Sequence, residues 1–104
     1  MNELENVVGF QWDAGNSGKN RKHGVADIEA EQVFFCENLL VARDERHSSG
    51  TETRFHALGE ASTGTRLHVT FTLRAGGELI RVISARPMSR KEQTIYETQD
   101  KDPA

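Results

Sequence analysis

The side chains of this sequence best suited to chemistry include a group of cations in its last quarter. Arg81 and Arg86 enclose a β-forming run, and Arg90 and Lys91 follow in the predicted first turn of a helix. The helix dipole does not favour cations in a first turn, so this placement suggests an anionic partner. Arginine suits such a partner because its planar guanidinium can hold two phosphate oxygens and stays charged at any working pH.

The spacing of the two strand arginines leaves two interpretations open. Arg81 and Arg86 are five residues apart, so in a regular strand their side chains point to opposite faces. Both reach one surface only if the strand bends or ends near Ala85. The structural alternative is that Arg81 forms an ion pair with Glu78 or Glu92, while Arg86 packs against the following helix.

Histidine is the natural group for proton transfer because its ordinary pKa lies near 6.5. His47 lies in a predicted loop, and His68 lies on the polar side of a predicted strand, where a solvated cross-strand role is the alternative. His23 precedes Gly24, which favours a structural role at a helix end. None of the histidines has the H-x-x-x-H or H-E-x-x-H spacing, so we expect neither a metal site nor a cofactor.

Length and composition predict one small domain over residues 1–104, with a core from about residue 8 to residue 98 and acidic, frayed ends. The single cysteine, Cys36, excludes an internal disulfide. No apolar run approaches the roughly 20 residues that a membrane helix needs, and the acidic start lacks the features of a signal peptide. We therefore expect a cytoplasmic protein.

The formal net charge of −3 hides an uneven distribution. Residues 19–91 contain twelve Lys and Arg against nine Asp and Glu, which gives +3, whereas the remaining residues contain one Lys and seven acids, which gives −6. A mildly basic body permits binding of a polyanion through Lys19, Lys22, Arg54, Arg90 and Lys91. Solubility alone is the alternative explanation of these charges.

The elements that must position these side chains follow from periodicity and turn signals. Strands are predicted over residues 7–12, 39–43, 54–59, 66–73 and 79–86, and helices over residues 13–23, 27–35 and 89–98. Residues 44–53 are predicted to form a loop. This order predicts an α+β fold, with a mostly antiparallel sheet and helices packed chiefly on one face.

The clearest local signals lie in the second half of the chain. Residues 66–73 alternate strictly between polar and apolar side chains, which is typical of a strand with one buried face. Gly76 and Gly77 then predict a hairpin turn. Ser89 and Glu92 have the S-x-x-E spacing of a capping box, which gives Glu92 a structural explanation.

Several segments together closely resemble the BrnT family of toxins. They are Phe10 to Asp13, Lys19 to Val25, Asp44 to Ser48, Glu52 to Arg54, and Ile83 to Arg86 with Arg90, Glu92 and Tyr96. Each piece is short, but their order and spacing cover roughly residues 8–98 and are specific in combination.

The resemblance implies a bacterial type II toxin with a RelE-like fold. Such a toxin is a ribonuclease that blocks translation and is held inactive by a BrnA-like ribbon-helix-helix antitoxin, and it reaches operator DNA only through that antitoxin. Metal-independent RNA cleavage through the 2′-hydroxyl needs a group that accepts its proton, an acid for the leaving oxygen, and cations on the developing phosphorane charge.

Particular residues are candidates for these catalytic roles. Arg81 and Arg86 are the candidates for phosphate contact, and His47, His68 or Tyr96 are the candidates for handling protons; Tyr96 could instead stack on a base or simply pack. The alternative function is a catalytically degenerate module that binds a DNA-binding antitoxin and takes part only in operon autorepression.

Overall fold

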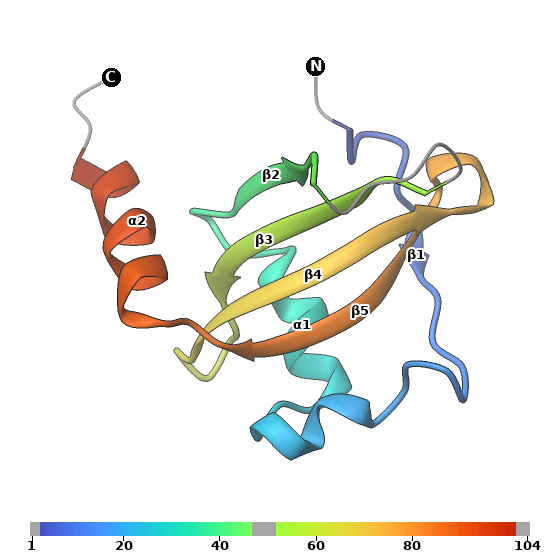
Figure 1. The fold of residues 1–104 in the computed structure, drawn as a ribbon, viewed down its shortest axis with the longest axis horizontal. Helices are drawn as coiled ribbons and strands as arrows, with labels where there is room; N and C mark the ends of the chain where they lie inside the picture. The colour runs from blue at the N-terminus through green and yellow to red at the C-terminus, as the bar shows by residue number, and fades with distance from the viewer. Residues whose placement is uncertain (1–2, 47–51, 102–104) are drawn as a thin grey trace.

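A computed structural model describes residues 3–46 and 52–101 of the chain, and its centre is a five-stranded sheet (Figure 1). The strands are β1 (Gly9–Phe10), β2 (Leu40–Asp44), β3 (Arg54–Glu60), β4 (Arg66–Arg74) and β5 (Leu79–Pro87), in the spatial order β1-β5-β4-β3-β2. The short β1 runs parallel to β5, and the other pairs are antiparallel. The predicted α+β class is confirmed, and the arrangement is consistent with a RelE-like fold.

One face of the sheet carries the main hydrophobic core. The alternation predicted for residues 66–73 is confirmed on this face, because Leu67, Val69 and Phe71 are fully buried in the core. The other face of this strand is not wet along its whole length as expected, because Thr72 is only 1% exposed. The helix α1 (Asp27–Val33) covers this face with its buried residues Ala30 and Val33. Because that helix is short, most of its stability must come from this packing rather than from its own hydrogen bonds.

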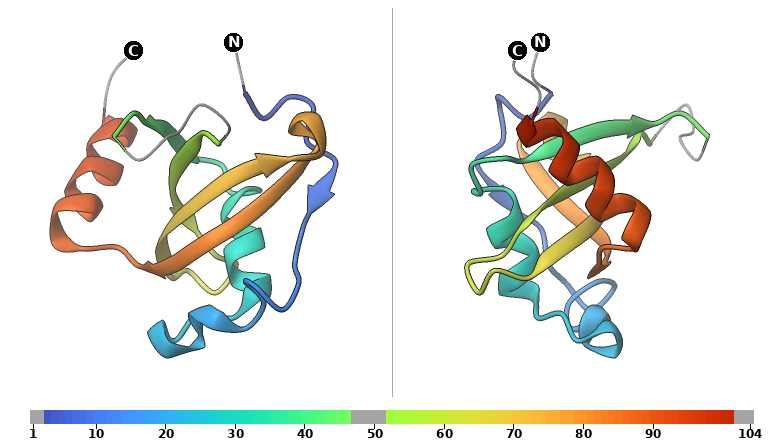
Figure 2. Two further views of the ribbon diagram at one scale, coloured as in Figure 1. Left: turned by 45° about the vertical axis from the view of Figure 1, so that its right-hand side comes forward. Right: turned by 90° about the vertical axis from the view of Figure 1, so that its left-hand side faces the viewer.

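The opposite face is covered at one end by α2 (Arg90–Lys101), which projects from the end of β5 (Figure 2). Tyr96 of α2 and Met88 form a second, small core with Leu58 of β3. The predicted capping box is confirmed: Ser89 Oγ accepts a hydrogen bond from the Glu92 amide at 3.2 Å, and Glu92 Oε1 accepts one from the Ser89 amide at 2.9 Å. The cap fixes the angle at which the chain leaves β5.

The prediction of a helix over residues 13–23 is wrong. The carboxylate of Asp13 accepts a hydrogen bond from the Gly15 amide at 2.8 Å, which forms a local turn instead. Gly18 then adopts a left-handed conformation with φ of 71°, so only a short 3₁₀ segment, η1 (Lys19–His23), follows. Gly24 ends η1 with φ of 78°, in the terminating role predicted for it.

Two buried asparagines in this N-terminal region replace strand pairing along β5. β1 pairs only with Leu79 and Ile80, so the rest of β5 lacks a strand neighbour on that side. Asn16 Nδ2 donates to the Val82 carbonyl at 3.0 Å, and Asn20 Oδ1 accepts from the Ala85 amide at 2.9 Å. Backbone groups that would otherwise be unpaired are thereby satisfied.

A β-bulge in β5 changes which side chains share a face. Thr70 of β4 pairs with Ser84, but its neighbour Phe71 pairs with Val82, so Ile83 is an extra residue in the ladder. Beyond the bulge the alternation of β5 is inverted relative to a regular strand. Side chains five residues apart across the bulge therefore point to the same face.

The remaining elements are connections. The segment η2 (Ala75–Gly77) links β4 to β5, and both of its glycines have positive φ, as expected for a tight hairpin turn. Within the described residues, no helix is both long enough and apolar enough to cross a membrane.

Candidate active site

A concave pocket of about 430 Å³ lies on the face of the sheet that α2 covers at one end. We call it the histidine pocket, because His56 of β3 and His68 of β4 form part of its wall together with Leu58, Arg86 and Glu92. The strands bring His56 and His68 to the same face because Thr70 lies directly opposite His56, two residues from His68. This is the diagonal relationship in which long side chains of an antiparallel pair can touch.

The two imidazole rings make direct contact. Their centroids are 4.8 Å apart with an interplanar angle of 22°, and Nε2 of His68 lies 2.9 Å from Nδ1 of His56. His56 Nδ1 also lies 3.1 Å from Oγ1 of Thr70. On the other side of the ring, His56 Nε2 lies 2.8 Å from Oδ2 of Asp44 at the end of β2.

These distances fit one arrangement of protons in which both rings are neutral. An ionised carboxylate only accepts hydrogen bonds, so Nε2 of His56 must carry the hydrogen that binds Asp44. Nδ1 of a neutral His56 is then an acceptor, and Nε2–H of His68 can donate to it. Nδ1 of His68 is left with its lone pair, and this buried atom has no hydrogen-bond partner among the described residues.

The surroundings of His68 favour the neutral form that this arrangement requires. Burial is the main reason that its pKa lies below the usual 6.5; Glu92 opposes the shift, and Arg86 and His56 add to it. The lowered pKa therefore keeps His68 in the neutral form in the neutral pH range, so one of its ring nitrogens carries a lone pair.

Arg86 and Glu92 form a bidentate ion pair beside the histidines. The two guanidinium nitrogens lie 2.8 Å from the two carboxylate oxygens, and Nη1 also donates to the Pro87 carbonyl at 3.2 Å. Arg86 is the main reason that the pKa of Glu92 falls to about 2. The guanidinium keeps further N–H groups for another acceptor, because an arginine carries five.

Arg81 lies on the same face as Arg86 but at the other end of β5. Its Nη1 and Nη2 donate to the Asp13 carboxylate at 2.9 and 3.0 Å, and Nη1 also donates to Gln11 at 3.0 Å. The ion-pair alternative raised for Arg81 therefore holds, but with Asp13 as its partner instead of Glu78 or Glu92. We interpret Arg81 as a link between the N-terminal turn and β5.

Tyr96 lies in the small core beneath α2, where it is 1% exposed. Its ring contacts the guanidinium of Arg66, 5.5 Å from the ring centroid, and its hydroxyl lies 3.9 Å from Sγ of Cys36. This burial favours the packing role over base stacking. We interpret Tyr96 as the residue that holds α2 against the sheet.

The candidates for RNA contact occupy different parts of the molecule. Arg54 lies on the same face as His56, two residues earlier in β3. Arg90 and Lys91 are exposed in the first turn of α2, next to Glu92. Lys19 and Lys22 are exposed on η1, which contacts the edge of β5 through Asn20. None of these residues lines the histidine pocket, but Arg54 is two residues from His56, and Arg90 and Lys91 lie within two residues of Glu92 in the chain.

Sequence reasoning did not select His56 or Asp44 as site residues. Asp44 was expected in a loop, but it is the last residue of β2 and lies opposite Arg54 in the ladder. The sequence contained one signal for His56. The turn predicted at residues 61–64 sets the register of the hairpin formed by β3 and β4, and that register puts His56 beside His68. The candidate His47 lies outside the described residues. Within those residues, no group of three or more His, Cys, Asp or Glu is arranged to hold a metal ion.

Comparison with known protein families identifies a match over most of the chain. A family model described as the ribonuclease toxin BrnT of type II toxin-antitoxin systems matches residues 12–92. No curated protein matches the chain. The matched range begins at Trp12, ends at Glu92, and includes both histidines of the pocket and Arg86.

Proposed function

The chain belongs to the BrnT family of ribonuclease toxins of type II toxin-antitoxin systems, and from this premise we propose that it cleaves RNA in the histidine pocket without a metal ion. An RNA substrate and an antitoxin partner follow from family membership. The proposal adds the site and the chemistry. The observation that carries it is the hydrogen-bonded line Asp44–His56–His68, which ends on a nitrogen that has a free lone pair.

In this proposal His68 is the general base. Its Nδ1 takes the proton of a ribose 2′-hydroxyl, the 2′-oxygen attacks the adjacent phosphorus, and the bond to the 5′-oxygen breaks. The leaving 5′-oxygen takes a proton from solvent water and becomes the 5′-hydroxyl end. Asp44 and His56 hold the tautomer of His68 that leaves Nδ1 unprotonated, as an orienting carboxylate does in other acid–base sites. His68 Nδ1 is buried in the free chain, so RNA must displace a neighbouring side chain to reach it.

Arg86 is the proposed phosphate ligand. It lines the same pocket, its side chain is 40% exposed, and it is held in place by Glu92. A phosphate can bind the guanidinium N–H groups that Glu92 leaves unused or compete with Glu92 for the others. A fixed cation beside the reacting phosphate stabilises the charge that develops in the transition state. Arg54, Arg90 and Lys91 supply sequence-independent attraction for the RNA backbone.

The biological role follows from the proposed chemistry. Cleavage of RNA in the cytoplasm stops translation, and a BrnA-like ribbon-helix-helix antitoxin holds the toxin inactive and carries the pair to operator DNA. The chain itself needs no DNA-binding surface for this role.

The test is cleavage of a labelled RNA by the purified chain in buffer containing EDTA. We expect products with 2′,3′-cyclic phosphate and 5′-hydroxyl ends, and loss of protein synthesis when the chain is added to a cell-free translation reaction. Cleavage that stops in EDTA and returns with added Mg²⁺ would overturn the metal-independent mechanism. RNA cleavage without loss of translation would overturn the proposed biological role.

A further inference from the structure

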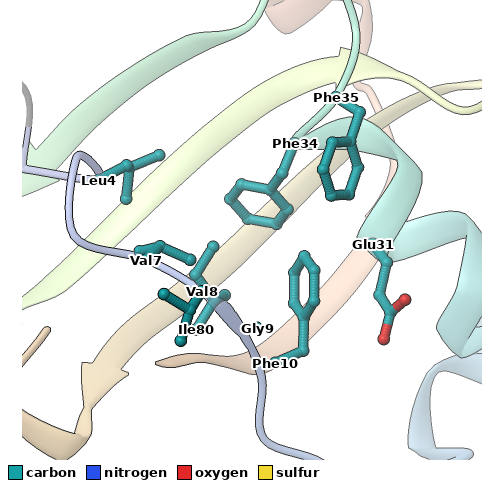
Figure 3. A pocket seen from close by; sticks show the side chains of 9 residues that line it. All are labelled: Leu4, Val7, Val8, Gly9, Phe10, Glu31, Phe34, Phe35 and Ile80. Carbon is teal, nitrogen blue, oxygen red and sulfur yellow. The ribbon is translucent and has the colours of Figure 1, made fainter. Parts of the chain in front are cut away.

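A second pocket, of about 490 Å³, lies on the core side of the sheet, and Figure 3 shows the side chains that line it. We call it the β1–α1 pocket. It lies between the segment that leads into β1 and the end of α1, and the side chains that build its wall are mainly apolar: Leu4, Val7, Val8, Phe10, Phe34 and Phe35. No residue that lines the histidine pocket also lines this one.

The rim of the β1–α1 pocket exposes large apolar side chains. Val8 is 79% exposed and Phe35 is 78% exposed. Phe34, next to Phe35, packs edge-on against the buried Phe71 with ring centroids 5.0 Å apart, so the rim is anchored to the main core. Phe10 contacts both rings, with centroids 5.6 Å from Phe34 and 6.3 Å from Phe35. Anchored aromatic residues around an apolar hollow are typical of protein–protein contact sites.

The charge around the pocket indicates the chemistry of its occupant. Glu31 lines the pocket and accepts a hydrogen bond from Trp12 Nε1 at 2.6 Å. Glu5 is exposed in the segment that leads into β1, and residues 1–18 contain no Lys or Arg. An apolar surface that includes Glu31 and adjoins an N-terminal segment without basic residues complements a segment that carries apolar side chains beside basic ones.

We propose that the β1–α1 pocket is the docking surface for the antitoxin, which inserts an amphipathic segment with apolar side chains flanked by Lys or Arg. The proposal rests on the proposed function for the identity of the partner, since the pocket alone specifies only the chemistry of the segment. Val8 and Phe35 are the contacts that docking would bury. Because the two pockets lie on opposite faces of the sheet, this contact supplies affinity without touching His56, His68 or Arg86.

The experiment measures binding of the purified antitoxin encoded by the neighbouring gene to the full chain. Val8→Asp and Phe35→Asp each place a charge on the apolar rim, at exposed positions where folding tolerates it. We expect the Kd for the antitoxin to rise at least tenfold in each variant, while RNA cleavage stays within twofold of the wild type. Ile28→Asp is the matched control. Ile28 of α1 is also an exposed apolar residue, at 58%, but it does not line the pocket.

The outcomes separate this proposal from the others. Wild-type affinity in both Val8→Asp and Phe35→Asp overturns it, as does an equal loss in Ile28→Asp. If light scattering finds that the free chain is a dimer that these variants dissociate, with antitoxin binding unchanged, the pocket is an interface between two copies and the proposal is wrong. If the variants lose antitoxin binding while the wild type fails to cleave RNA, the docking surface is supported and only the proposed catalytic function fails.

Discussion

Nε2 of His68 lies within hydrogen-bond distance of Nδ1 of His56, and the imidazole rings of the two residues are stacked. The N···N distance is 2.9 Å, and the ring centroids are 4.8 Å apart. A proton on His56 opposes a second proton on His68, because two positive rings at this distance repel. The first two predictions follow from this relationship.

Removal of the proposed base should reduce cleavage without unfolding the chain. His68→Gln keeps a polar side chain of similar size but cannot take up a proton in the neutral pH range. We expect kcat for RNA cleavage to fall by about 10²-fold to 10³-fold, within the range typical of general acid–base groups. His23→Gln is the control, since His23 is exposed on η1, and it should retain wild-type activity. If His68→Gln cleaves RNA at the wild-type rate, His68 is not the general base.

The lowered pKa of His68 should also make stability depend on pH. In the unfolded chain this residue gains a proton near pH 6.5, whereas burial in the folded chain resists protonation. As the pH falls below 6.5 the unfolded state therefore binds more protons and the folded state loses stability. Urea denaturation between pH 7.5 and about 5 should reveal a decline in the wild type that is smaller in His68→Gln. Parallel curves for the two proteins would contradict the prediction.

The ion pair between Arg86 and Glu92 should contribute stability that disappears at low pH. Glu92 has a folded pKa of about 2 against an ordinary value of 4.5, so its contribution is complete above pH 4.5 and is lost as the pH falls towards 2. We expect Glu92→Gln to lower the free energy of unfolding at pH 7 by about 2 kcal/mol, after a reduction for solvent screening. In urea denaturation, the difference in the free energy of unfolding between Glu92→Gln and the wild type should become smaller as the pH falls from 4.5 to 2.

The two arginines of β5 should respond differently to the same substitution. Arg86→Lys keeps the charge but loses the planar fork, so we expect kcat to fall at least tenfold. Arg81→Lys loses the bidentate contact with Asp13, which should lower the thermal midpoint while cleavage stays within threefold of the wild type. The kcat values of the two variants should be compared in cleavage assays at a temperature at which both variants are folded. A larger loss of kcat in Arg81→Lys would assign the phosphate contact to Arg81.

The packing role of Tyr96 can be separated from a role in proton transfer. Tyr96→Phe removes only the hydroxyl and should cleave RNA at close to the wild-type rate. Tyr96→Ala removes a buried aromatic ring and should lower the free energy of unfolding by about 3 kcal/mol, as other large-to-small core substitutions do. If Tyr96→Phe is folded but does not cleave RNA, the Tyr96 hydroxyl takes part in catalysis. Circular dichroism and urea denaturation provide the stability measurement.

Much of the fold was predictable because local patterns and packing agree. The alternation in β4, the glycines of its hairpin and the Ser89–Glu92 cap each depend on residues that are neighbours in the chain, so each appears in the sequence. The prediction of a helix over residues 13–23 failed because a local turn competes with the helix there. The Asp13 carboxylate satisfies a nearby amide and pairs with Arg81, which favours a turn over a helix.

The site was predictable in its residue types but not in its assembly. The sequence by itself determined the family, the strand that carries Arg81 and Arg86, and the presence of His68 on a polar face. Only the tertiary structure decided that Asp44 meets His56, because β2 and β3 are joined through a connection that leaves their register open. It also decided that both arginines share one face, because the extra residue Ile83 is accommodated by pairing with β4, and a bulge is a property of two strands together.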